Sequence, residues 1–217
     1  HATDEAVAAI HEKLGLDDPY LVRLGRYIVN LCQGDMGTSY RTGRPVSEEL
    51  MARFPVTLRI TIFAVVVGTL LGILAGVVSA VKQYSLFDRI LTAVSLFGAS
   101  APSFWLAMLF VLFFSLKLGW LPATGSYGVE YWILPIVTLG LQCSASITRM
   151  TRSSMLEVIR QDYVRTARAK GQTEFKVIVS HALRNALIPI LTVIGGQACG
   201  YIGGTVLIES VFGLPGI

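Results

Sequence analysis

Four stretches of this 217-residue chain contain no charged side chain. They are 22, 27, 18 and 24 residues long and cover Ile60–Val81, Ile90–Leu116, Tyr131–Thr148 and Asn185–Ile208. A helix needs about 20 mostly apolar residues to cross the roughly 30 Å hydrocarbon core of a bilayer. Because lipid offers no water to unpaired backbone groups, each stretch should be helical. The pattern predicts an all-α integral membrane protein with spans at about 57–81, 90–116, 131–150 and 185–208.

The composition excludes several broad classes of protein. Charged residues make up 15% of the chain, against roughly 25% in an average soluble domain. Hydrophobic residues make up 53%, which is too many for a disordered chain. The three cysteines are an odd set without metal-ligand spacing, unlike the cysteines of a disulfide-stapled secreted module. We therefore expect neither a soluble globular domain nor a disordered or secreted one.

Sequence motifs that carry catalysis do not occur in the chain. It contains no G-x-S-x-G, no H-E-x-x-H, no Walker A motif and no G-x-G-x-x-G. The histidines, His1, His11 and His181, have no further histidine and no cysteine at helical spacing. We expect no catalytic residue and no metal site, so the chain is not predicted to be an enzyme.

The second charge-free stretch is too long for one straight crossing. Its 27 residues would make a helix about 40 Å long at 1.5 Å per residue. Pro102 lies near its middle and removes a helical hydrogen-bond donor. A kink or break near Ser100–Ser103 is therefore predicted.

Lysine and arginine are distributed unevenly between the loops. Residues 149–184 hold eight of them and residues 82–89 hold two. On the opposite side there are five near the spans, namely Lys117 and the four arginines Arg41, Arg44, Arg53 and Arg59. Loops rich in these residues usually stay in the cytoplasm. We expect loop 151–184 to be cytoplasmic and residues 1–55 to lie outside, in a multi-pass membrane protein.

The predicted domains follow from this topology. Residues 1–55 form an extracytoplasmic segment with short amphipathic helices, one of them over Pro19–Leu31, and residues 56–217 form the transmembrane domain. His1 is not an initiator methionine, and no signal peptide precedes the outer segment. We expect a longer parent chain of six helices, of which this sequence holds about four to five complete spans.

Glycines recur every four residues in two of the predicted spans. They are Gly68, Gly72 and Gly76 in the first span, and Gly196, Gly200 and Gly204 in the fourth. Small residues at this spacing let helix backbones approach closely. The pattern predicts either packing within the chain or a helix surface that slides or pairs with a second subunit, and it leaves both open.

Polar residues inside the spans are neutral. A carrier coupled to protons or sodium usually has buried carboxylates or histidines in its pathway, so this pattern disfavours ion coupling. Candidates for lining a pathway are Gln142, Ser146 and Gln197. The alternative is that these side chains bond to neighbouring helices.

The sequence of the basic loop between the last two spans predicts a helix, a sharp turn at a glycine and then a second helix. Apolar residues from Leu156 to Ala167 fall on one face at helical spacing, Gly171 suits a sharp turn, and the apolar segment Phe175–Val179 follows. Such an element could rest on anionic lipid headgroups, or it could dock on a cytosolic partner. The spacing alone favours neither.

This loop resembles the signature of permease subunits of ABC importers, written E-A-A, three residues, Gly, nine residues, I-x-L-P. Ala167, Gly171 and Leu183 fit that general form. The variant DYVRTARAKG followed by HALRNALIP is more similar to the branch that imports dipeptides, oligopeptides and nickel. Four further stretches resemble that branch: LGLDDPYLVRLGRYI, GDMGTSYRTGRPV, SAPSFWLAM and ESVFGLPGI.

The resemblance implies the transmembrane domain of a type I ABC importer, in the bacterial cytoplasmic (inner) membrane. It implies four kinds of partner: a second homologous permease, two cytosolic ATPase subunits, an extracytoplasmic solute-binding protein and membrane lipid, but no nucleic acid. ATP and magnesium would bind to the ATPase subunits, and this chain would bind no cofactor. The residues implied in coupling to the ATPase are Tyr163, Arg165, Thr166, Ala167, Arg168, Gly171, His181 and Leu183. An ion-coupled carrier and a membrane scaffold are the alternatives, and the cargo is left open between peptides and nickel.

Overall fold

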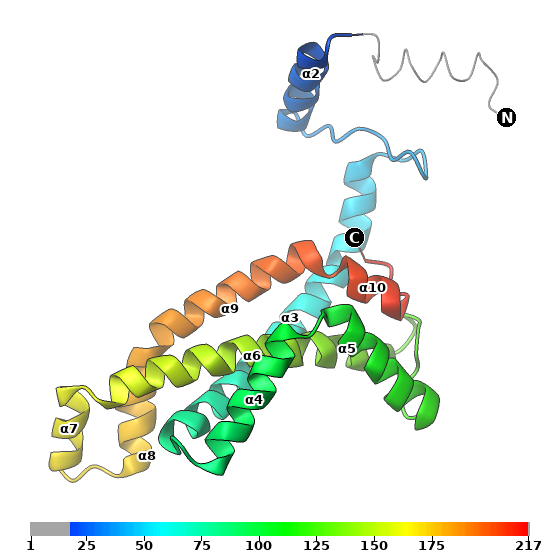
Figure 1. Cartoon of the computed structure of the whole chain (residues 1–217). Helices are drawn as coiled ribbons and strands as arrows, with labels where there is room; N and C mark the ends of the chain where they lie inside the picture. Colours follow the sequence, from blue (N-terminus) through cyan, green and yellow to red (C-terminus); the bar gives the residue numbers. More distant parts are fainter. Residues whose placement is uncertain (1–17, 217) are drawn as a thin grey trace. The chain divides into compact units, whose positions relative to one another are not determined.

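The computed structural model describes residues 18–216, and these residues are mainly helical (Figure 1). The chain divides into two compact units, His1–Arg53 and Phe54–Ile217. In the first unit, α2 runs over Tyr20–Cys32, where the sequence predicts an amphipathic helix. A turn-rich segment follows, with an isolated antiparallel bridge between Thr38 and Pro45. Helix α3 begins in this unit, at Val46.

The second unit is a set of long helices joined by short connections. Their bounds, in chain order, are α3 (Val46–Val81), α4 (Leu86–Ser100), α5 (Ser103–Phe110), the π-helical η1 (Val111–Lys117), α6 (Glu130–Ile159), α7 (Asp162–Ala169), α8 (Glu174–Lys176), the π-helical η2 (Val177–Leu183), α9 (Arg184–Gly204) and α10 (Val206–Phe212). Within the described residues, three helices are long and apolar enough to span a membrane, and the bent pair Leu86–Ser100 and Ser103–Lys117 makes a possible fourth. The structure is thus an all-helical membrane fold.

The predicted break in the second span is present. Helices α4 and α5 meet at an angle of 106°. Pro102 disfavours the helical conformation of the residue before it, and Ala101 is accordingly extended, with φ −72° and ψ 132°. The Ala101 carbonyl that the break leaves outside the helix accepts a 3.0 Å hydrogen bond from Nε2 of Gln142 on α6. The break is therefore supported by a neighbouring helix.

Helix α6 is the centre of the second unit. Both α4 and α9 run beside it (Figure 1). One apolar cluster joins α3, α5, α6 and α10 through buried residues such as Ile60, Ala107, Leu139 and Phe212. A second cluster joins Ile147 and Met155 of α6 to η2 and α9. In lipid, such helices are held together by close packing rather than by removal of apolar surface from water.

The outward side chains of α3 are apolar as well. Phe63, Leu70 and Leu74 are all exposed, whereas the same helix buries Thr57, Thr61 and Ser79. A surface helix of a soluble protein shows the reverse arrangement. Large apolar side chains directed outward, with polar ones turned inward, are those of a helix that faces lipid.

The glycines of α3 provide its contact with α6. Three contacts repeat at four-residue spacing: Gly68 against Cys143, Gly72 against Ile147, and Gly76 against Thr151. A Cβ atom on Gly72 would lie only 2.7 Å from the Cβ of Ile147. In α9, a Cβ atom on Gly196, Gly200 or Gly204 would meet no described atom within 4 Å. The two glycine series therefore differ: one lies in a packed interface within the chain, and the other is on its surface.

Candidate functional site

The loop between α6 and α9 folds as two short helical segments around a glycine corner. Helix α7 (Asp162–Ala169) precedes Gly171, and α8 with η2 follows it. Gly171 has φ +76° and no atom within 4 Å of its missing side chain. An L residue is strained in this left-handed conformation, although nothing would collide with it. The corner therefore needs glycine for backbone reasons alone.

The single apolar face predicted from Leu156 to Ala167 is wrong, because two helices share those residues. Helix α6 ends at Ile159, and Gln161 is extended, with φ −73° and ψ 150°, before α7 begins. The acidic Asp162 in the first turn of α7 interacts favourably with the positive helix N-terminus. A new helix start at this point redirects the chain and breaks the helical period.

Helix α7 has an inner face that packs within the loop. Val164 is fully buried and Ala167 is 5% exposed, and both belong to a small cluster with Val177 of η2. Val158 of α6 packs against the same cluster. Of the residues implied in coupling, Ala167 therefore lies on the side that attaches α7 to its own loop.

The outer face of α7 is polar and exposed. It carries Tyr163, which is 43% exposed, Arg165 and Thr166. The Thr166 hydroxyl donates to the Asp162 carbonyl at 2.9 Å. The Arg165 guanidinium lies 3.7 Å from the Asp162 carboxylate. This face is the part of the loop that is open to a partner.

Two polar contacts tie the corner to the segment after it. Arg168 donates from Nε to Oε1 of Glu174 at 2.8 Å, across Gly171. This hydrogen bond raises the pKa of Arg168, which is therefore charged at every physiological pH. His181 Nε2 lies 2.7 Å from Oε1 of Gln172. Leu183, the last of the residues implied in coupling, is partly buried against the core cluster of α6 and α9.

The three pathway candidates do not all have the same surroundings. The Gln142 amide is used at the α4–α5 break, where it donates to Ala101. Ser146 and Gln197 are half-buried on α6 and α9. The structure thus shows a hydrogen bond for Gln142, and pathway lining by all three residues stays a prediction.

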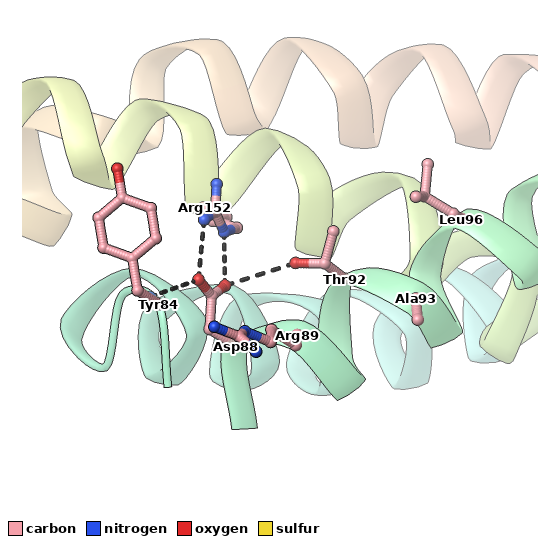
Figure 2. A pocket seen from close by; sticks show the side chains of 7 residues that line it. All are labelled: Tyr84, Asp88, Arg89, Thr92, Ala93, Leu96 and Arg152. Atoms are coloured by element: carbon pink, nitrogen blue, oxygen red, sulfur yellow. Dashed lines mark hydrogen bonds and ion pairs between the residues drawn. The ribbon is translucent and has the colours of Figure 1, made fainter. Parts of the chain in front are cut away.

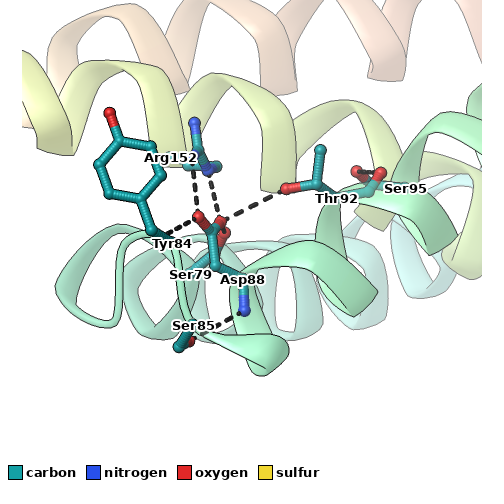
Figure 3. Close-up of polar contacts among 7 residues, drawn as sticks. All are labelled: Ser79, Tyr84, Ser85, Asp88, Thr92, Ser95 and Arg152. Atoms are coloured by element: carbon teal, nitrogen blue, oxygen red, sulfur yellow. Dashed lines mark hydrogen bonds and ion pairs between the residues drawn. The ribbon is translucent and has the colours of Figure 1, made fainter.

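A buried ion pair that the sequence analysis did not identify lies at one end of α4. Asp88 is 3% exposed. Arg152 of α6 donates to its carboxylate from Nε at 2.7 Å and from Nη2 at 2.9 Å (Figure 2). Further donors to the same carboxylate are the Ser79 hydroxyl, the Tyr84 amide and the Thr92 hydroxyl (Figure 3). Buried charges are stable in proteins when paired and hydrogen-bonded in this way.

The turn between α3 and α4 is shaped by the same cluster. Tyr84 has φ +65°, a conformation that non-glycine residues rarely adopt. Its backbone N–H donates to Asp88 Oδ2 at 2.9 Å. Beside the ion pair lies a hollow of about 370 Å³, lined by Tyr84, Asp88, Arg89, Thr92, Ala93, Leu96 and Arg152 (Figure 2). The cluster therefore connects α3, the turn, α4 and α6 through one carboxylate.

A second buried acid connects α3 to α10. Glu209 is 2% exposed. Its Oε1 accepts hydrogen bonds from Thr57 at 2.6 Å and from Thr205 at 3.0 Å. Glu209 directly follows the fourth charge-free stretch, so its position in the sequence does not reveal that it is buried.

Together these features define an all-helical membrane protein with an exposed helical loop between two of its long helices. Residues 68–217 match the family model for the binding-protein-dependent transport system inner membrane component. The chain is 43% identical to the dipeptide transport system permease protein DppB of Alkalihalophilus pseudofirmus, over all of this chain and 73% of the relative. It is 42% identical to the glutathione transport system permease protein GsiC of Salmonella typhimurium, over all of this chain and 71% of the relative.

Two solved structures share the fold. The MetNI methionine ABC transporter in inward-facing conformations aligns with a TM-score of 0.63 at 21% identity, covering 75% of this chain and 74% of that one. An amino acid ABC transporter with histidines aligns with a TM-score of 0.60 at 16% identity, covering 78% of this chain and 74% of that one. The chain belongs to the family of inner membrane permease subunits of binding-protein-dependent ABC transporters.

Proposed function

We propose that this chain is the permease of an importer for short peptides, working by alternating access in the cytoplasmic membrane. Relatives over the full chain are named for dipeptide, glutathione and peptide transport. These cargoes share amide groups and charged ends, which supports a peptide in preference to nickel. The complete importer would contain a second homologous permease, two cytosolic ATPase subunits and an extracytoplasmic solute-binding protein.

The proposed role of the chain is mechanical. ATP and magnesium would bind to the ATPase subunits. This chain would catalyse no chemical reaction and would bind no cofactor. Closure of the ATPase pair would move the docked α7, and the spans would then change which side of the membrane is open. In this topology residues 1–55 lie outside and loop 151–184 lies in the cytoplasm.

One observation carries the coupling proposal: α7 is attached to the core through its inner face while its outer face is open. Val164 and Ala167 pack on Val177 of η2, and η2 continues directly into α9. A force on α7 would therefore reach α9 through packed side chains rather than through a flexible linker. Tyr163, Arg165 and Thr166 would contact the ATPase, whereas Ala167, Gly171, His181 and Leu183 would hold the loop in shape.

The test separates docking from folding. Arg165→Glu reverses a charge on the exposed face of α7, and Lys82→Glu reverses an exposed charge in the α3–α4 turn. Each variant is assembled with its partner permease, ATPases and binding protein in proteoliposomes, and uptake of a labelled dipeptide is measured. We expect Arg165→Glu to abolish uptake and to weaken ATPase binding. The uptake rate of Lys82→Glu should be close to that of the unsubstituted protein. Equal uptake by both variants would remove α7 from the interface.

A further inference from the structure

Helix α2 presents its apolar side outward. Leu21, Leu24, Ile28 and Leu31 recur at helical spacing, and they are 77%, 40%, 51% and 40% exposed. Val22 and Val29 lie beside this row and are also exposed. No residue of α2 is buried. The helix therefore has a continuous aliphatic face that the described part of its own unit does not cover.

The polar side of α2 is the side turned towards its own unit. Arg23, Arg26 and Asn30 follow one another at helical spacing. All three line a hollow of about 1160 Å³, together with Leu24 at the edge of the aliphatic row, and the other wall of the hollow includes Asp35, Arg41 and Glu49. Arg26 also donates to Asp18 at 2.8 Å. If this short unit were surrounded by water, the aliphatic face of α2 would pack inward and its polar face would point to the solvent.

The composition of the outward face favours lipid over protein. Protein contact surfaces depend on central tryptophan, tyrosine and arginine side chains, and this face has only aliphatic ones. Tyr20 and Tyr27 adjoin the polar row and line the hollow with it. Helices that lie in a membrane interface have this arrangement, with aliphatic side chains below and aromatic and basic ones at headgroup level.

Chain length brings lipid within reach of α2. Helix α3 has 36 residues, about 54 Å at 1.5 Å per residue, so it is longer than the roughly 30 Å hydrocarbon core that it crosses. The hollow that α2 lines also includes Val46 and Glu49 of the first turn of α3, so α2 lies beside the end of that helix. We propose that α2 lies parallel to the bilayer surface with Leu21, Leu24, Ile28 and Leu31 inserted at the boundary between headgroups and acyl chains.

The experiment compares two neighbouring positions on opposite faces of α2. Cys32, Cys143 and Cys199 are replaced by alanine, and one cysteine is then introduced by Ile28→Cys or by Asn30→Cys. Each is labelled with the environment-sensitive fluorophore NBD in the full chain, in nanodiscs of phosphatidylethanolamine and phosphatidylglycerol. Quenching is measured with a lipid that carries a nitroxide near its headgroup and with aqueous iodide.

We expect the lipid nitroxide to quench the label at position 28 about threefold more than the label at position 30, and iodide to show the opposite order. Leu21→Cys and Arg23→Cys form a second pair that should behave in the same way. Equal access of iodide to both faces would overturn the proposal. Protection of position 28 only after the binding protein or partner permease is added would also overturn it, since the face would then bind protein. Neither result would affect coupling through α7.

Discussion

Arg152 holds Asp88 through two hydrogen bonds of 2.7 and 2.9 Å, joining α6 to α4 at a distance of 64 residues in the chain. The same carboxylate accepts hydrogen bonds from Ser79 of α3 and from the Tyr84 amide. Three helices thus meet at one nearly inaccessible acid. Since α6 leads through Arg160 and Gln161 into α7, the ion pair lies between the transmembrane helices and the loop proposed to couple them to ATP hydrolysis.

Asp88→Ala should destabilise the permease more than an ordinary loss of one ion pair. It leaves the Arg152 guanidinium without its partner, and breaking a buried pair costs about 3–5 kcal/mol. Thermal unfolding of the purified protein in detergent should show a clear fall in midpoint. The matched control, Glu157→Ala, removes an exposed acid from α6 and should change the midpoint little. If both variants unfold alike, the ion pair does not stabilise this end of the bundle.

Leucine at Gly72 should disrupt the contact between α3 and α6. The added side chain would overlap Ile147, and overpacking typically costs about 1–3 kcal/mol. Gly200→Leu adds the same side chain to α9, where no described atom lies within 4 Å of the position. The yield and unfolding midpoint of the isolated chain should fall for Gly72→Leu only. A drop for Gly200→Leu that appears only in the assembled importer would instead indicate that a second subunit covers α9.

Proline at Gly171 should stop uptake without preventing membrane insertion. Proline holds φ near −65°, whereas this corner has φ +76°. Gly119 has φ +63°, also with open space around it, in the connection after η1, so Gly119→Pro imposes a similar backbone conflict away from the loop. Dipeptide uptake should be lost for Gly171→Pro and largely kept for Gly119→Pro. Full uptake by an inserted Gly171→Pro permease would contradict the coupling role.

Replacement of Gln142 by leucine tests whether that amide supports the helix break. Without it, the Ala101 carbonyl loses its 3.0 Å donor, and an unsatisfied buried polar group costs about 1–3 kcal/mol. We expect a lower unfolding midpoint, with Gln197→Leu as the comparison on α9. If uptake changes with no loss of stability, Gln142 acts in the pathway and not at the break.

The membrane orientation is checked by cysteines on opposite loops. Thr173→Cys lies in the loop proposed to be cytoplasmic, and Tyr127→Cys lies in the connection between η1 and α6, where Tyr127 is 97% exposed. With Cys32, Cys143 and Cys199 replaced by alanine, a thiol reagent that cannot enter intact cells should label position 127 and leave position 173 unlabelled until the cells are opened. Labelling of position 173 in intact cells would reverse the topology.

Local sequence patterns predicted the long helices and two of their interruptions. A run without charges, such as Ile60–Val81, which lies within α3, indicates a membrane helix because the length of the apolar run has to match the bilayer. Pro102 predicted the break and Gly171 the corner, because proline and glycine restrict or free the backbone at their own positions. The start of α7 at Asp162 was not predicted, because the apolar residues keep their helical spacing from the end of α6 into α7.

Contacts between distant segments were decided only by the tertiary structure. Asp88 reads as one acid in a basic loop, yet it is buried because Arg152, 64 residues later, is brought within 2.7 Å. The two glycine series have the same spacing, but only Gly68, Gly72 and Gly76 face a neighbouring helix. Spacing along one helix depends on the residues of that helix. Burial and pairing depend on which other helix lies opposite, and this is set by the free energy of the packed bundle as a whole.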